Sequence, residues 1–238
     1  MNGAVDGVDP FSAPALVFVD DLAAPVIDAD DRHHLERVRR LRAGTVVVAS
    51  DGLGSWRPVR LGPDAEPCGE VVADPVRIPL ITVAFTPVKG DRPEWVVQKL
   101  TELGVDRIIP LRADRSVVRW DDGRGGRQVD RWTRVAREAA MQCRRTRLPT
   151  LSGIVDALEV LAEPGTAAAD VGGAPPDLTH PTVAIGPEGG WSPAELAVVD
   201  HRIALGDNVL RAETAALAAG TLLTALRAGL TTPTRTVR

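Results

Sequence analysis

Two glycine-containing stretches near the C-terminal end decide the fold, AIGPEGGWS at residues 184–192 and LGDNVLRAET at residues 205–214. Each has the pattern of a short apolar strand, a loop and a helix. In the first stretch, Ser192 has the side chain of a helix N-cap, and Glu195 is the acid three positions later that completes a capping box. The pattern therefore predicts an α/β fold with a loop at the end of each strand.

Glycine loops at the carboxyl ends of neighbouring parallel strands are where α/β sheets bind ligands. These two loops offer backbone N–H and C=O groups, while Gly189 and Gly190 permit a close backbone approach. Either loop alone is also typical of a plain strand–helix turn. The two together favour a binding site.

At this spacing the loops resemble motifs two and three of the SPOUT methyltransferases, and most closely the family that makes 3-methyluridine in small-subunit (16S) ribosomal RNA. That family carries IGPEGG, present here at residues 185–190, and LG…LRxETA, present at 205–215. The resemblance implies a deep trefoil knot, an exception to the rule that chains are unknotted. It also implies that S-adenosylmethionine binds in a bent form, mainly through backbone groups.

The resemblance further implies which residues contact the cofactor. They come from both loops and from the end of an earlier strand. The predicted contacts are Thr86, Ile185, Gly186, Pro187, Glu188, Gly189, Gly190, Leu205, Gly206, Leu210, Glu213 and Thr214. An alternative for Glu188 and Glu213 is that they orient the loops as acids at helix N-termini.

Length and composition limit the other possibilities. A chain of 238 residues can hold one large domain or two of ordinary size. No apolar run approaches the roughly 20 residues that span a membrane. The two cysteines, Cys68 and Cys143, lie far apart, which favours a reduced cytoplasmic setting and predicts no metal site. The four histidines likewise lack the spacing of metal ligands, and His180 is expected to stand alone.

Basic residues are concentrated in two segments. The net charge of −4 argues against indiscriminate nucleic-acid binding, but eleven arginines face five acids across residues 112–147, and five face one across 32–42. Of the 28 basic residues, 26 are arginine, which reads phosphates in bidentate fashion and stacks on bases. The clusters predict RNA binding, although solvated helix faces and a GC-rich genome also produce arginine excess.

Residues 1–76 are predicted to form an N-terminal domain. Short strand patterns at 15–19, 25–27, 45–49, 55–61 and 69–73 indicate a small β-barrel, with a helix from Asp30 or Asp31 to Arg40 that turns Leu35 and Val38 inward. The order resembles the PUA-like RNA-binding barrel of the same family. The chain departs from it by lacking an arginine before the first strand and by having Arg39 where a leucine is usual.

Residues 77–238 are predicted to form the knotted catalytic domain. We expect strands at 80–85, 107–111, 167–169, 183–185 and 203–205, and helices at 92–103, 127–144 and 213–226. The helical period of segment 92–103 is set by Trp95, Val96, Lys99, Leu100 and Leu103. Residues 171–181 are expected to form a mobile loop. The runs KLTELGV at 99–105 and REAAMQCRR at 137–145 resemble family signatures, although Arg144 replaces a glycine. Alternatively, Lys99 and Glu102 form a surface pair and the second run is a solvated face.

Methylation at uridine N3 requires an unpaired, deprotonated base. We predict Arg211 or Arg145 as the group that stabilises the uracil anion, and Glu138 as the proton acceptor. Side chains of the two basic segments and of the loop at 115–118 are predicted to contact RNA. These are Arg32, Arg37, Arg39, Arg40, Arg115, Arg134, Gln142 and Arg144.

The sequence thus predicts a methyltransferase of ribosome biogenesis that acts on 16S ribosomal RNA within the small subunit, and the family resemblance implies a homodimer. One alternative is a SPOUT enzyme that methylates a ribose 2′-hydroxyl. Another is a non-catalytic RNA-binding assembly factor, and a third is a nucleotide-binding enzyme unrelated to RNA. Triad, Walker and GxGxxG patterns are absent, which argues against hydrolases and Rossmann enzymes.

Overall fold

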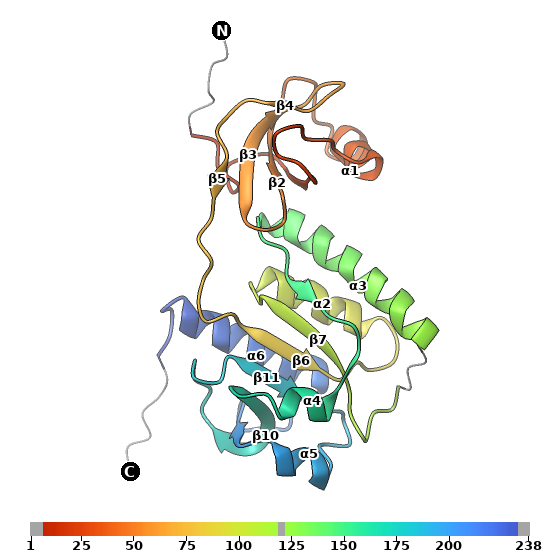
Figure 1. Ribbon diagram of the computed structural model, residues 1–238, viewed down its shortest axis with the longest axis vertical. Helices are drawn as coiled ribbons and strands as arrows, with labels where there is room; N and C mark the ends of the chain where they lie inside the picture. Colours follow the sequence, from red (N-terminus) through yellow and green to blue (C-terminus); the bar gives the residue numbers. More distant parts are fainter. Residues whose placement is uncertain (1–6, 119–121, 233–238) are drawn as a thin grey trace. The chain divides into compact units, whose positions relative to one another are not determined.

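The computed structural model describes residues 7–118 and 122–232. The chain divides into two units (Figure 1). The first unit joins Met1–Val76 to Arg137–Leu148, and the second joins Arg77–Ala136 to Pro149–Arg238. The long helix α3 (Asp122–Cys143) therefore contributes to both units. The expected C-terminal tail from residue 233 onward lies outside the described residues.

The first unit contains a small mixed sheet. Its strands are β1 (Leu16–Phe18), β2 (Val46–Ser50), β3 (Ser55–Arg60), β4 (Glu66–Pro67) and β5 (Val72–Ala73). β1 is parallel to β2, and β3 pairs antiparallel with β2, β4 and β5. In the described part of the chain no pairing joins β1 to β4 or β5, so a closed barrel stays a prediction. The strand expected at 25–27 is not formed, since these residues have no regular secondary structure.

A short helix follows this segment. α1 (Ala29–His33) begins at Asp28, two residues before the earlier of the expected caps, and the Asp28 carboxylate accepts a 2.8 Å hydrogen bond from the Asp31 backbone. The helix continues as a π-helix over His34–Val38. Because π turns bond residue i to i+5, positions three apart no longer share a face. Leu35 is buried as expected, but Val38 is 63 % exposed.

One arginine of the basic helix α3 has a structural role in the first unit. The Arg137 guanidinium donates to Asp31 at 2.5 Å, to Asp28 at 3.1 Å and to the Phe18 carbonyl at 3.3 Å. The hydrogen bond with Asp31 raises the pKa of Arg137 above its ordinary value. This arginine is therefore engaged within the fold.

The second unit is built on a parallel sheet, as the sequence predicts. The strands run in the order β12-β10-β11-β6-β7-β8, with β9 also paired to β7, and every pairing is parallel. Their bounds are β6 Thr82–Phe85, β7 Arg107–Arg112, β8 Thr150–Leu151, β9 Val155–Asp156, β10 Thr166–Ala174, β11 Thr182–Ile185 and β12 His201–Ile203.

Helices cover both faces of this sheet. Alternation along the strands sends Val83 and Phe85 into one core, with α2 (Arg92–Glu102), α3 and α6 (Ala212–Arg227). It sends Ala84 into a second core, with α4 (Ala157–Leu161) and α5 (Pro193–Val198). Because the helices cover the faces of the sheet, loops lie at the carboxyl ends of its strands. Within the described residues, no helix has the length and apolarity to cross a membrane.

Some details of the second unit differ from the expectations. The buried stripe of α2 is Pro93, Val96, Val97, Leu100 and Thr101. Trp95 is 45 % exposed and, contrary to expectation, lies off this stripe. Lys99 and Glu102 form a half-exposed pair at 2.8 Å, which favours the surface-pair interpretation.

β10 is longer than predicted. It reaches Ala174, so the start of the expected loop at 171–181 is strand. A side chain at Gly173 would come within 2.5 Å of the Ile203 backbone, which shows how closely β10 approaches β12 there. β12 begins two residues earlier than expected and ends at Ile203.

The end of α6 is held by a buried arginine, which allows a stability prediction. Arg227 is paired with Asp106 and donates to the carbonyls of Pro79 at 3.2 Å and Gly104 at 2.9 Å. Its side chain is only 7 % exposed. Since Arg227→Met removes a buried cation bound by the Asp106 carboxylate and by two backbone carbonyls, we expect the free energy of unfolding to fall by about 3 kcal/mol.

Urea unfolding measures this loss. Arg202→Met is the matched control, because Arg202 is 48 % exposed and its pair with Asp170 spans 3.3 Å. We expect that control to change the free energy of unfolding by less than about 0.5 kcal/mol. Similar losses in both variants would contradict a structural role for the buried pair.

Candidate functional site

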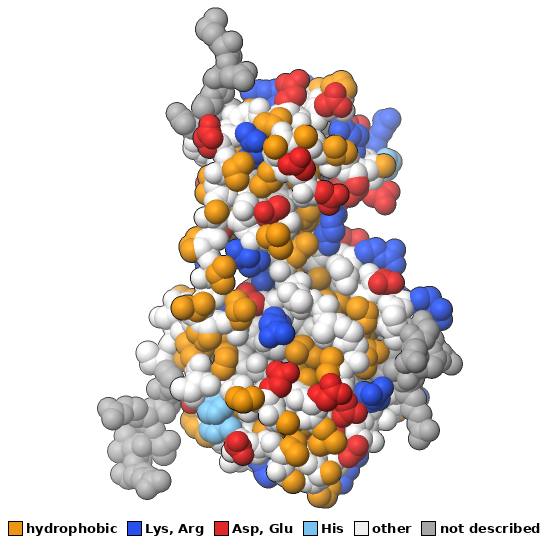
Figure 2. All heavy atoms as spheres, in the orientation of Figure 1, with side chains coloured by type: hydrophobic (Ala, Val, Ile, Leu, Met, Phe, Trp, Pro, Cys, Tyr) orange, Lys and Arg blue, Asp and Glu red, His pale blue; other side chains and the backbone are white. Residues whose placement is uncertain are grey.

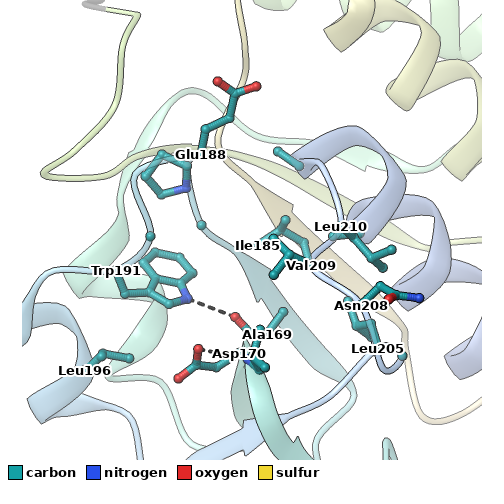
Figure 3. A pocket seen from close by; sticks show the side chains of 17 residues that line it. Ala169, Asp170, Ile185, Glu188, Trp191, Leu196, Leu205, Asn208, Val209 and Leu210 are labelled. Atoms are coloured by element: carbon teal, nitrogen blue, oxygen red, sulfur yellow. Dashed lines mark hydrogen bonds between the residues drawn. The ribbon is translucent and has the colours of Figure 1, made fainter.

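A pocket of about 340 Å³ opens at the carboxyl end of β11 and beside the middle of β10, between the two glycine loops (Figure 3). This volume is in the range of small-molecule sites. Trp191, Asp170 and Leu196 lie on one side of the pocket and Leu205, Asn208 and Leu210 on the other. The full lining is Ala169, Asp170, Val171, Ile185, Gly186, Pro187, Glu188, Gly190, Trp191, Leu196, Leu205, Gly206, Asn208, Val209, Leu210, Ala212 and Ala215.

The first loop is shaped by glycine. Gly190 has φ of +68°, and its N–H donates to the Pro187 carbonyl at 2.8 Å. A Cβ on Gly186 would lie 2.9 Å from the Trp191 ring. Trp191 is buried, and its indole N–H donates to the Ala169 carbonyl at 3.2 Å. Gly186 therefore lets the indole form one wall of the pocket.

The predicted capping box holds the end of this loop. The Ser192 hydroxyl accepts from the Glu195 backbone at 3.2 Å, and the Glu195 carboxylate accepts from the Ser192 backbone at 2.7 Å. The other oxygen of Glu195 accepts from the Asp114 backbone at 2.9 Å, and Ser192 donates to the Asp114 carboxylate at 2.5 Å. Glu195 is 1 % exposed. It thereby links the loop after β7 to the pocket loop.

Replacement of this buried carboxylate tests the link. In Glu195→Gln, an amide NH₂ group faces one of the two backbone N–H donors, so one hydrogen bond is lost and a buried donor is left unpaired. We expect the free energy of unfolding to fall by about 2 kcal/mol and the melting temperature to drop by roughly 4–8 °C. Glu159→Gln, at an exposed position of α4, is the control. An equal, small effect of both in thermal unfolding would refute the prediction.

The second loop connects β12 to α6. Arg211 is the N-cap residue of α6 and makes no side-chain capping bond. Its side chain is exposed, and among the described residues it has no hydrogen bond or ion pair. It stands between Leu210 and Ala212, which both line the pocket. An arginine free of internal partners beside the pocket is available to a bound molecule.

The lining includes most of the predicted cofactor residues but not Thr86, Gly189, Glu213 and Thr214. Thr86 is buried, and its hydroxyl donates to the Ile185 carbonyl at 3.2 Å, so it joins the end of β6 to the end of β11. The Gly189 carbonyl accepts from Arg115 at 3.0 Å. Glu213 pairs with Arg92 at 2.9 Å in the first turn of α6, which favours its role as an orienting acid.

Sequence reasoning missed the part of the pocket lining that β10 provides. Ala169, Asp170 and Val171 belong to β10, the strand between β11 and β12. Asp170 accepts from Arg202 at 3.3 Å. The sequence signal that could have identified Asp170 is its position directly after the apolar strand pattern at 167–169. The other missed residues are Trp191, Leu196, Asn208, Val209, Ala212 and Ala215.

The predicted catalytic residues belong to different units. Arg211 lies in the second unit, whereas Glu138 and Arg145 lie in the first. Glu138 is exposed on α3. Arg145 is half-buried, and its backbone N–H donates to the Ala140 carbonyl at 2.9 Å. Only Arg211 adjoins the pocket within its own unit.

The predicted RNA-binding residues fall into two groups. Arg37, Arg39, Arg40, Arg134 and Gln142 are exposed. The others have internal partners. Arg32 donates to the Gly62 carbonyl at 2.7 Å, and Arg115 to Gly189 as described above. Arg144 donates to the Pro14 carbonyl at 2.6 Å, and burial together with the charge of Arg39 lowers its pKa from the ordinary value.

Comparison with known proteins gives consistent matches. The family of RNA methyltransferase domains matches residues 76–224. "Ribosomal RNA small subunit methyltransferase E" of Mycobacterium bovis is 33 % identical, over 86 % of this chain and 88 % of the relative. The protein of that name in Bacillus subtilis is 29 % identical, over 80 % and 86 %. The crystal structure of the Neisseria gonorrhoeae protein of that name, bound to S-adenosyl methionine, superposes with a TM-score of 0.75 at 25 % identity, covering 89 % of this chain and 97 % of the other.

Proposed function

This chain belongs to the RNA methyltransferase family that includes ribosomal RNA small subunit methyltransferase E, and on that premise we propose that it methylates N3 of a uridine in 16S ribosomal RNA. The methyl donor is S-adenosylmethionine, which the related Neisseria gonorrhoeae structure contains. The observation that carries the proposal is the pocket between the two glycine loops, beside Arg211, whose side chain has no partner among the described residues.

The pocket residues suit this cofactor. Apolar side chains such as Ile185 and Leu210 suit its adenine ring, and the backbone of both loops offers groups for hydrogen bonds. The carboxylate of Asp170 is suited to accept from ribose hydroxyls. When bound, the cofactor supplies a methyl group on a positively charged sulfur. Gly186 and Trp191 form a wall of the pocket that would hold it in place.

The chain's own residues then act on the base. Uracil N3 carries a proton that must leave before the nitrogen attacks the methyl carbon, and the base must be free of pairing. We assign Arg211 to the uracil oxygens, where its charge stabilises the anion as an oxyanion donor does. Glu138 is the proposed proton acceptor and Arg145 a second cation.

We further propose that residues 1–76, completed by residues 137–148, form a PUA-like RNA-binding domain, and that the rest of 77–238 forms a knotted catalytic domain. The exposed arginines Arg37, Arg39 and Arg40 support RNA binding by the first. The parallel sheet and the two pocket loops support the second. We expect a homodimer acting in the cytoplasm on the small ribosomal subunit.

Transfer of labelled methyl from S-adenosylmethionine to small ribosomal subunits, followed by nucleoside analysis, tests the reaction. The expected product is 3-methyluridine. A 2′-O-methylated nucleoside would keep the family and overturn the reacting atom. Absence of both methyl transfer and heat of cofactor binding in calorimetry would instead support a non-catalytic assembly factor.

A further inference from the structure

Three potential metal ligands meet at the amino ends of the parallel strands. Asp177 and His180 lie in the segment between β10 and β11, and His201 is the first residue of β12. Their ligand atoms all lie within 4.8 Å of one another. The expectation that His180 stands alone is therefore wrong. The histidines of the second unit form a pale-blue patch on the face drawn in Figure 2.

This cluster is separate from the cofactor pocket. His201 opens β12, whereas the pocket loop with Leu205 follows the carboxyl end of that strand. His180 likewise precedes β11, and Ile185 and Gly186 follow at its other end. Because β11 and β12 both run parallel to β10, the cluster and the pocket occupy opposite edges of the sheet. The proposed methyl transfer does not use the cluster.

One donor atom of the cluster is buried without a partner. His201 Nε2 is inaccessible to solvent and makes no hydrogen bond in the described part of the chain. A buried polar atom of this kind costs free energy unless something binds it. The His201 ring also stacks on that of His180, with centroids 3.8 Å apart and planes inclined by 4°. Imidazole nitrogens are the commonest metal ligands in proteins.

The other two ligands are arranged by a tight turn. Asp177 Oδ1 accepts from the backbone and hydroxyl of Thr179 at 2.9 and 2.7 Å and from the His180 backbone at 3.2 Å. His180 Nδ1 lies 3.2 Å from the same oxygen. The side chains of Asp177 and His180 are 35 % and 26 % exposed, so solvent and ions have access.

We propose that Asp177, His180 and His201 bind one divalent transition-metal ion of the zinc type. Two imidazoles and one carboxylate suit Zn²⁺ and its neighbours, with water as a fourth ligand, whereas Mg²⁺ and Ca²⁺ prefer oxygen ligands only. In a parallel stack the lone pairs of the two rings do not point at a common ion. Binding therefore requires the His180 ring to turn toward the ion, which is feasible because His180 lies in a connecting segment. His201 stays in place on its strand. The ion then ties the segment before β11 to β12.

Calorimetric titration of the untagged full chain with Zn²⁺ tests this site, with absorption of bound Co²⁺ reporting the coordination geometry. The matched variants are His180→Gln/His201→Gln and His33→Gln/His34→Gln; each removes two of the four histidines, and the second pair is exposed in the first unit. We expect one equivalent of Zn²⁺ on the wild type and on the His33/His34 variant. Affinity should fall at least about 100-fold in the His180/His201 variant, since two of three protein ligands are gone.

Stability gives a second readout. At a hundredfold excess of free Zn²⁺ over the dissociation constant, the melting temperature of the wild type should rise by on the order of 5 °C. The single variant His180→Gln, outside the strands, guards against misfolding of the double variant and should also lose this rise. Circular dichroism and cofactor binding confirm that each variant is folded.

The proposal fails if the wild type binds no Zn²⁺, or if both double variants lose affinity equally, which would indicate adventitious surface binding. Methyl transfer should be the same in wild type and His180→Gln. The proposed metal site and the proposed methyltransferase activity are therefore tested independently of each other.

Discussion

Replacing Arg211 by alanine is expected to lower kcat/KM for methyl transfer roughly 10²- to 10³-fold, while the melting temperature changes by no more than about 1 °C. The side chain is exposed and has no internal partner among the described residues, so its removal costs the fold little. Its neighbours Leu210 and Ala212 line the pocket, so its charge is available to the developing uracil anion. Steady-state kinetics on small subunits and thermal unfolding measure the two quantities.

Two further variants serve as controls for this result. Arg107→Ala removes another exposed arginine, at the amino end of β7, and should leave kcat/KM unchanged. Arg211→Lys keeps the charge and should restore part of the rate, because electrostatic stabilisation survives while bidentate geometry does not. If Arg211→Ala lost stability and rate together, the arginine would be structural and the catalytic assignment would be wrong.

Gly186→Val should weaken binding of S-adenosylmethionine on the order of 100-fold. The new Cβ would lie 2.9 Å from Trp191 Cε2, and its two methyl groups add further crowding. Trp191 is 7 % exposed and hydrogen-bonded to Ala169, so it has little freedom to yield except into the pocket. The displaced indole then occupies space needed by the cofactor. Calorimetric titration with the cofactor measures the effect.

Gly153→Val is the control, because a Cβ at Gly153 meets no atom within 4 Å. It should bind the cofactor as the wild type does. Unchanged affinity in Gly186→Val would mean that the ligand does not use the wall formed by Trp191, and the assignment of this pocket would need revision.

Local chemistry made parts of this protein predictable. The start of α5 follows from Ser192 and Glu195, which bond to each other's backbone and need no other element. Gly104, with φ of +86°, ends α2 where the sequence indicates. The parallel sheet follows from apolar strands alternating with helices. The pocket loops follow from glycines that succeed two of those strands.

Contacts between distant segments were not predictable in this way. Asp170 joins the pocket because β10 pairs with both β11 and β12, a topology that no local pattern contains. His180 and His201 are brought together by the same pairing. Val38 and Trp95 were assigned to buried faces from helical period alone. The π-helical turn moves Val38 off the buried face. Trp95 lies next to the buried stripe of α2, whose position is set by packing against α6.

The division of α3 between the two units has a consequence for synthesis on the ribosome. The first unit takes residues 137–148 from beyond the second unit's first strands, including Arg137, which neutralises Asp31. One core cluster of this unit comes entirely from residues before 76, but the cluster around Phe18 and Trp56 includes Ala140. That second cluster cannot close when residue 76 leaves the ribosome, and must wait until the end of α3 has emerged. For the same reason a gene fragment that ends at residue 76 encodes only part of a domain, and the unit cannot be transplanted as an uninterrupted cassette.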